Sequence, residues 1–142
     1  MFTISHPPTD AAVHEFASRW TEQLAQENYI EAYGMLCHVQ NHPGRSWVFS
    51  PEELRNWIEN YGSDTPIPGE PPYKVTKIEQ ASGEQWGNYL ELSPSDARYV
   101  GYLGNLDWGL PLNGEWSDLQ ASFDLVAIDQ RVGFVLVALR VP

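Results

Sequence analysis

The sequence predicts one α+β domain in which N-terminal helices pack on a curved, mixed or antiparallel sheet. Apolar residues recur at the helical period before residue 62 and alternate at the strand period after residue 73. A stretch with four prolines, residues 63–72, separates these two halves. Because 142 residues is an ordinary length for one domain, residues 1–142 are interpreted as a single domain.

Two helices are expected in the first 37 residues. Thr9 or Asp10 can cap the first helix, and Asn28 can cap the second, with Glu31 three residues later at the capping-box position. The apolar stripe of the first helix consists of Val13, Phe16, Ala17, Trp20 and Leu24. The apolar face of the second is expected to contain Ile30, Tyr33, Leu36 and Cys37.

A third helix has the strongest local signal in the chain. Ser50 is a favourable cap, Pro51 suits the first helical position, and Glu53 stands three residues after the cap. Gly62 is expected to end this helix. Its apolar face consists of Leu54, Trp57, Ile58 and Tyr61, and residues 47–49 before it form a short β-like run.

The second half reads as an antiparallel sheet. Strands are expected at residues 73–80, 86–92, 98–104, 119–128 and 132–141, with turns at 94–97 and 129–133 and a loop at 105–117. The last strand is apolar on both faces, since Phe134, Leu136 and Ala138 alternate with Val135, Val137 and Leu139. Either a twofold partner subunit or the loop 105–117 is expected to cover its second face.

The helical part resembles the nuclear-transport-factor-2-like superfamily, which includes ketosteroid isomerase. The resemblance rests on residues 16–20 and 27–33 and on the order of the elements. It implies a cone-shaped, cystatin-like α+β roll. Residues 112–119, with the strands that follow, are similar to the endings of some uncharacterised bacterial proteins. Because the superfamily includes enzymes, ligand carriers, immunity-type proteins and assembly modules, the resemblance leaves the function open.

The charge excludes some classes of partner. With 19 acidic and 8 basic residues, the net charge of −11 repels phosphate backbones and anionic membranes, so neither nucleic acid nor membrane is expected as a partner. The charge favours solubility or a basic protein partner. Cys37 is the single cysteine, so no intrachain disulfide can form. No signal-peptide pattern stands at the N-terminus, and a cytoplasmic location is expected.

Asp107 is the best catalytic candidate. It lies between Leu106 and Trp108, and apolar neighbours raise the pKa of a carboxyl group toward the range useful for acid–base chemistry. The alternative is a turn aspartate that bonds its own backbone. His38 and His42 have the spacing of helical metal ligands, but Pro43 follows at once, so neither a metal site nor a cofactor is expected.

Three functions follow from these candidates. The first is a non-enzymatic interaction or assembly protein, dimeric through the sheet face. The second is the binding of a small apolar ligand inside the cone. The third is an isomerase- or dehydratase-like enzyme with Asp107 as acid or base. Asp124 shares a strand face with Gln120 and Ser122 and would face either the cone or the solvent. The residues expected to line the cone wall, if they are not simply packed, are Tyr33, Trp57, Trp108 and Trp116.

Overall fold

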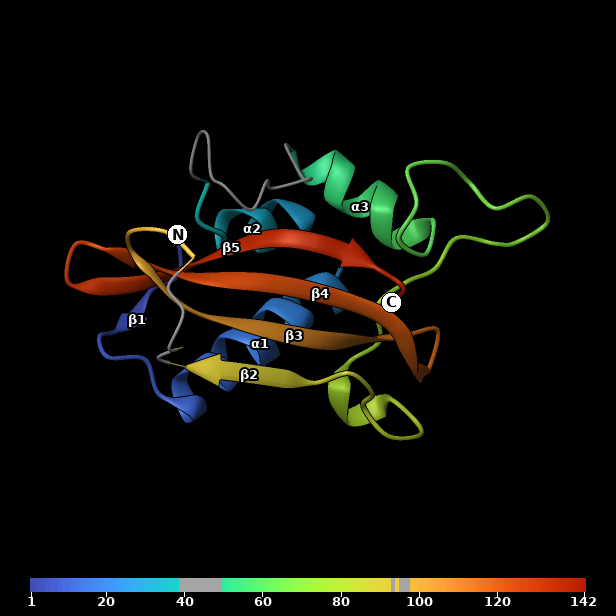
Figure 1. Ribbon diagram of the computed structural model, residues 1–142. Helices are drawn as coiled ribbons and strands as arrows, with labels where there is room; N and C mark the ends of the chain where they lie inside the picture. The colour runs from blue at the N-terminus through green and yellow to red at the C-terminus, as the bar shows by residue number, and fades with distance from the viewer. Residues whose placement is uncertain (39–49, 93, 95–97) are drawn as a thin grey trace.

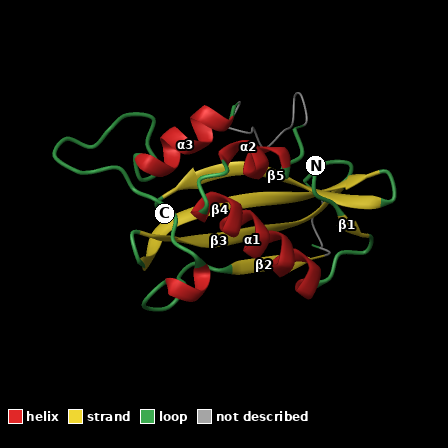
Figure 2. Ribbon diagram, turned by 180° about the vertical axis from the view of Figure 1, so that it is seen from behind, coloured by secondary structure: helices red, strands yellow, loops and turns green. Residues whose placement is uncertain are grey.

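The computed structural model describes residues 1–38, 50–92, 94 and 98–142. Its helices α1 (Asp10–Ala25), α2 (Tyr29–Gly34) and α3 (Pro51–Glu59) lie on one face of a curved sheet (Figures 1 and 2). The five antiparallel strands have the order β1-β5-β4-β3-β2. They are β1 (Ile4–Ser5), β2 (Tyr89–Leu92), β3 (Tyr102–Leu112), β4 (Glu115–Ile128) and β5 (Arg131–Arg140). The predicted α+β fold, with N-terminal helices on a curved sheet, is confirmed.

The local signals for α1 and α3 are also confirmed. Thr9 caps α1, because its Oγ1 accepts from the Ala12 amide at 3.2 Å. The predicted α1 stripe is completely buried. Ser50 Oγ caps α3 by accepting from the Glu53 amide at 3.1 Å. Each cap satisfies a backbone donor that has no partner inside its own helix.

The second helix is shorter than expected, and its predicted apolar face is only partly correct, because the buried Leu36 and Cys37 lie beyond its end. It ends at Gly34, its buried residues are Tyr29 and Ala32, and Ile30 is 73% exposed. The chain leaves the helix early and approaches the sheet, where the Cys37 amide donates to the Phe134 carbonyl at 2.7 Å. Pairing with β5 therefore takes precedence over continuing the helix.

The predicted strand at 73–80 and the predicted loop at 105–117 are both wrong. Residues 73–80 contain one bridge, between Val75 and Leu112, and a 3₁₀ turn at Ile78–Gln80. Residues 105–112 instead belong to β3 and residues 115–117 to β4, with a turn at 113–114, and β3 begins at Tyr102 rather than at residue 98. The expected run at 47–49 lies outside the described residues, as does most of the turn at 94–97.

Glycines explain why this hairpin looked like a loop. A Cβ at Gly104 would collide with the Glu91 carbonyl, and a Cβ at Gly109 with the Trp86 carbonyl. Both glycines therefore serve close approach of backbones within the sheet. Asn113 and Gly114 adopt positive φ angles of 50° and 91°, as a two-residue hairpin turn requires.

The core between α1 and the sheet is filled by aromatic rings. Phe16 stacks on Phe134 with centroids 3.8 Å apart and meets Phe123 edge-on at 5.3 Å. Trp20 meets the same Phe123 ring edge-on at 5.0 Å. All four rings are fully buried. Stacked and edge-on pairs contribute beyond their buried area, so this cluster fixes how α1 sits on the sheet.

A bulge changes the predicted faces of β5. Ser122 pairs with Ala138 but Phe123 pairs with Leu136, which leaves Val137 as an extra residue. Leu139, predicted on the second face, is consequently 1% exposed and belongs to the main core.

A small apolar cluster lies on the other face of β5. Val135 packs there with Val126 and Cys37, and Tyr99 packs against them from the turn before β3. The expectation that the loop 105–117 covers this face is wrong, since those residues form the β3–β4 hairpin. The chain itself supplies apolar cover, and a twofold dimer through this face stays a prediction.

Thr21 accounts for a buried polar link between α1 and β3. Trp108 Nε1 donates to Thr21 Oγ1 at 3.0 Å, and Thr21 Oγ1 donates to the Ala17 carbonyl at 2.8 Å.

Because Thr21→Val leaves the buried indole N–H without its acceptor, we expect a loss of about 1–3 kcal/mol in the free energy of unfolding. Thr21→Ser keeps the hydroxyl and should lose less. Urea unfolding of both variants tests this, and equal losses would contradict the role of the hydrogen bond.

Candidate functional site

Two clefts meet at the end of the molecule where α3 stops and the β3–β4 hairpin turns. The hairpin groove has a volume of about 320 Å³, and the proline cleft has a volume of about 220 Å³. Tyr73 lines both. The hairpin groove is lined by Tyr61, Tyr73, Leu112, Asn113, Glu115, Trp116, Ser117 and Asp118. The proline cleft is lined by Asn56, Glu59, Asn60, Pro66, Ile67, Glu70, Pro71, Pro72 and Tyr73.

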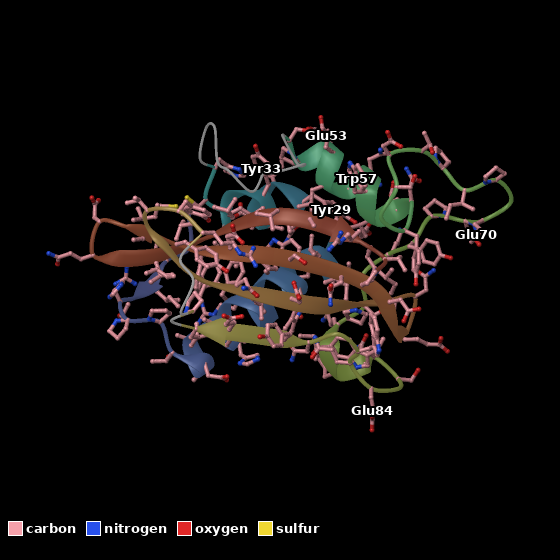
Figure 3. All side chains as sticks on the ribbon, in the orientation of Figure 1. Tyr29, Tyr33, Glu53, Trp57, Glu70 and Glu84 are labelled. Atoms are coloured by element: carbon pink, nitrogen blue, oxygen red, sulfur yellow. The ribbon has the colours of Figure 1, made fainter. Side chains whose placement is uncertain are left out.

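The proline cleft is formed by the chain reversal after α3. Tyr61 and Gly62 have positive φ angles of 55° and 82°, which turn the chain away from the helix axis. Residues 63–72 loop outward, and Glu70 lies on this loop, beyond the end of α3 (Figure 3). The loop returns where the Tyr73 amide donates to the Glu59 carbonyl at 3.1 Å. Four prolines restrict the backbone of this loop, so the wall of the cleft is stiff.

The hairpin groove is held by hydrogen bonds to the hairpin turn. The Lys74 amide donates to Asn113 Oδ1 at 3.0 Å, and the Gly114 amide donates to Thr76 Oγ1 at 2.7 Å. The Trp116 amide donates to the Ser82 carbonyl at 3.0 Å. Because these bonds join segments distant in sequence, the groove is shaped before any ligand arrives. A preformed site reduces the ordering cost of binding.

Aromatic rings line the hairpin groove. Tyr61 and Tyr73 are paired at 4.9 Å between centroids with an interplanar angle of 44°. The half-buried Trp116 lines the same groove from β4. Ring faces carry negative potential, so they attract cations as well as apolar groups.

Acidic side chains dominate the charge of both clefts. Within the part of the chain that the structure describes, neither lining contains a lysine, arginine or histidine. Glu115 and Asp118 are exposed, and no ion pair joins either of them to a described residue. Tyr73 donates to Glu70 Oε2 at 2.8 Å, and this bond, together with desolvation, raises the pKa of the Tyr73 phenol. The clefts therefore offer carboxylate acceptors and aromatic faces to a positively charged group.

The residues predicted to line the cone are spread over several parts of the structure. Trp116 lines the hairpin groove. Trp108 is buried between β3 and α1. Its indole N–H, the only donor of the side chain, donates to Thr21 Oγ1. Tyr33 on α2 stacks with His38 at 4.0 Å, and Trp57 on α3 packs at the margin of the core (Figure 3).

Asp107 and Asp124 lie on the face of the sheet opposite the helices. Asp107 accepts from Ser122 Oγ at 2.7 Å and lines neither cleft. Asp124 accepts from the Tyr99 hydroxyl at 2.8 Å and is only 2% exposed. Burial and this hydrogen bond raise the pKa of Tyr99 strongly. Asp124 therefore faces neither the interior of the cone nor open solvent, and acid–base chemistry at Asp107 stays a prediction.

Of the eight described residues that line the hairpin groove, sequence reasoning identified Trp116 alone as a site residue. The sequence pattern places Tyr61 on the core face of a helix, Tyr73 in a strand and Glu115 in the predicted loop 105–117. Asp118 lies between that loop and the next predicted strand. The signal that points to them is Asn113-Gly114, a frequent two-residue hairpin turn flanked here by alternating apolar residues. Reading that hairpin would have placed Glu115, Trp116 and Asp118 together at its end.

Neither similarity to known proteins nor a recognised type of site indicates the function. Comparison with models of protein families, with curated proteins and with solved structures finds no match. Within the described ranges, no three or more histidine, cysteine, aspartate or glutamate side chains gather as metal ligands would. In the same ranges we find no helix with the length and hydrophobicity needed to cross a bilayer. The function is therefore argued from the geometry of the clefts.

Two tyrosine hydroxyls, on the buried Tyr29 and the half-buried Tyr99, allow a matched test of polar groups within the fold. In the described part of the chain, the buried Tyr29 hydroxyl has no hydrogen-bond partner, whereas the Tyr99 hydroxyl donates to Asp124. Tyr29→Phe is expected to raise the free energy of unfolding by up to about 1 kcal/mol, because it removes an unsatisfied donor. Tyr99→Phe should lower it by about 1–3 kcal/mol. Urea unfolding at neutral pH measures both, and a destabilised Tyr29→Phe protein would contradict the assignment.

Tyr29 also predicts how stability changes at alkaline pH. Burial, with Glu27 and Glu59 nearby, raises the pKa of Tyr29 from 10.0 to about 12. A phenol whose pKa is raised by folding stabilises the fold fully below pH 10, and this contribution is lost as the pH rises from 10 to about 12. The wild type should therefore lose more stability over this range than Tyr29→Phe does. Identical pH profiles for the two proteins would refute the shift.

Proposed function

We propose that this protein is a non-enzymatic interaction protein that binds a basic segment of a partner protein across the hairpin groove and the proline cleft. The observation that carries the proposal is that, among the described residues, the linings of the two clefts contain the carboxylates Glu115 and Asp118 and no basic side chain. We also propose that the domain is a member of the nuclear-transport-factor-2-like superfamily, in which such non-enzymatic roles occur on the same fold.

The overall charge supports a basic partner. A net charge of −11 attracts cationic segments over the whole surface and accelerates their encounter with the protein. Specificity requires a local feature in addition, and the clefts supply it. Glu115 and Asp118 stand beside Trp116, so a guanidinium can meet a carboxylate and a ring face within one groove.

The shape of the clefts supports the recognition of side chains of an extended segment. The two volumes, about 320 and 220 Å³, are small and joined at Tyr73. Small-molecule pockets usually range from about 300 to 1,000 Å³ and enclose most of their ligand. The proline cleft is smaller than this range, and the hairpin groove lies at its lower limit. Adjacent small clefts with stiff walls suit consecutive side chains of a peptide better than one deeply buried molecule.

The alternative functions have less support. Phe16, Trp20 and Phe123 occupy the space between α1 and the sheet, which disfavours an apolar ligand inside the cone. Asp107 lies on the open face, hydrogen-bonded to Ser122, and lines neither cleft. The interaction proposal is therefore preferred to both the apolar-ligand and the Asp107 enzyme hypotheses.

Removing charge from the groove tests the proposal. A fluorescent arginine-rich peptide serves as the probe, and binding is measured by anisotropy at two salt concentrations. Glu115→Gln with Asp118→Asn should weaken binding about tenfold, because hydrogen bonds to charged groups are worth more than neutral ones. Trp116→Ala should also weaken binding, and added salt should weaken binding to the wild type.

A charge-matched control separates the groove from net charge. Glu79→Gln with Glu84→Gln removes the same charge from exposed positions that line neither cleft. This double variant should bind the peptide nearly as well as the wild type does. If both double variants lose affinity equally, the peptide responds to overall charge and the groove assignment is wrong.

A further inference from the structure

The outer edge of β2 is an unpaired strand edge. β2 is the last strand of the sheet, and no described strand pairs with the side that faces away from β3 (Figure 1). In an antiparallel edge strand, alternate backbone N–H and C=O groups point outward and can pair with another chain. Tyr89–Leu92 contains no proline and no lysine, the residues that commonly protect such edges.

Exposed aromatic rings accompany this edge. Tyr89 within β2 is 54% exposed, and Trp86 just before it is 52% exposed. Most large apolar side chains of the sheet are buried, so two exposed rings beside an open strand edge mark a surface suited to contact with another protein.

We propose that β2 pairs antiparallel with β2 of a second copy, which joins two sheets edge to edge about a twofold axis at Leu90. The alternation of side chains restricts the possible registers. A twofold between Leu90 and Glu91 would oppose Tyr89, on the open face, to Leu92, on the helix face. A twofold at Glu91 would oppose two carboxylates of the same sign.

The register centred on Leu90 is self-complementary. It places Tyr89 of each copy opposite Glu91 of the other, on the open face, and Leu90 opposite Leu90 on the helix face. The Tyr89 hydroxyl already donates to Glu91 Oε2 within one chain, at 3.1 Å. In the dimer, the Tyr89 hydroxyl of each copy can donate to Glu91 of the other copy instead, so both carboxylates keep a hydrogen-bond donor. Backbone bonds supply the affinity, and these side-chain pairs fix the register.

The charge of the protein makes the dimer sensitive to salt in a defined direction. Two copies that each carry a net charge of −11 repel one another, and salt screens this repulsion. Dimerisation therefore strengthens as the salt concentration rises. Binding of a basic peptide in the clefts weakens under the same change, so the dimer proposal and the proposed function fail independently.

Sedimentation velocity of the full chain over a range of protein and salt concentrations tests the dimer. The wild type should shift toward dimer with increasing concentration, and more so at high salt. Tyr89→Glu places two carboxylates opposite each other twice per dimer and should weaken dimerisation about tenfold. Ile30→Glu, at a 73% exposed position on α2, is the charge-matched control and should dimerise as the wild type does.

A charge swap tests the register itself. Combining Tyr89→Glu with Glu91→Lys opposes a carboxylate to an ammonium in both pairs, and dimerisation should return. Circular dichroism confirms that each variant is folded. A wild type that stays monomeric under all conditions, a Tyr89→Glu variant that dimerises normally, or a double variant that fails to recover would each overturn the proposal. A monomeric wild type that binds an unrelated extended peptide along β2 would assign the edge to a different partner.

Discussion

The stack of Phe16 on Phe134 is the contact on which the rest of the structure depends. Phe16 comes from α1 and touches β5 through this stack and β4 through Phe123. It therefore fixes which face of the sheet is covered and where α1 crosses it. Fully buried rings occupy the space between α1 and the sheet, and both described clefts lie outside that space, at the end of the molecule.

Elements with local signals were predictable, and elements that depend on distant contacts were not. Ser50 and Glu53 lie within one helical turn, so the start of α3 can be read from four residues. Gly104 and Gly109 look like loop residues in sequence. The absence of a side chain instead leaves room for the carbonyl groups of Glu91 and Trp86, which are distant along the chain.

The candidate site shows the same division. Trp116 was identifiable as a large ring outside the helical stripes, and it lines the hairpin groove. Tyr61 and Tyr73 meet because the Glu59 carbonyl accepts from the Tyr73 amide across the whole proline-containing loop. The surroundings of Asp124 could not be predicted without its partner Tyr99, which lies in a turn that folds over the open face of the sheet. Such pairings depend on loop closure and tertiary packing, which periodicity along one segment does not encode.

The acidic surface gives the clefts and the β2 edge opposite electrostatic preferences. Excess negative charge lowers the free energy of a cation in the clefts and raises that of a second copy near the sheet. A contact between copies therefore has to rely on short-range, directional bonds that need no net charge. An open strand edge supplies such bonds through its backbone, whereas a surface of exposed carboxylates does not. This reasoning favours contact between copies at the edge of the sheet over contact through its carboxylate-bearing face, where Asp107 lies.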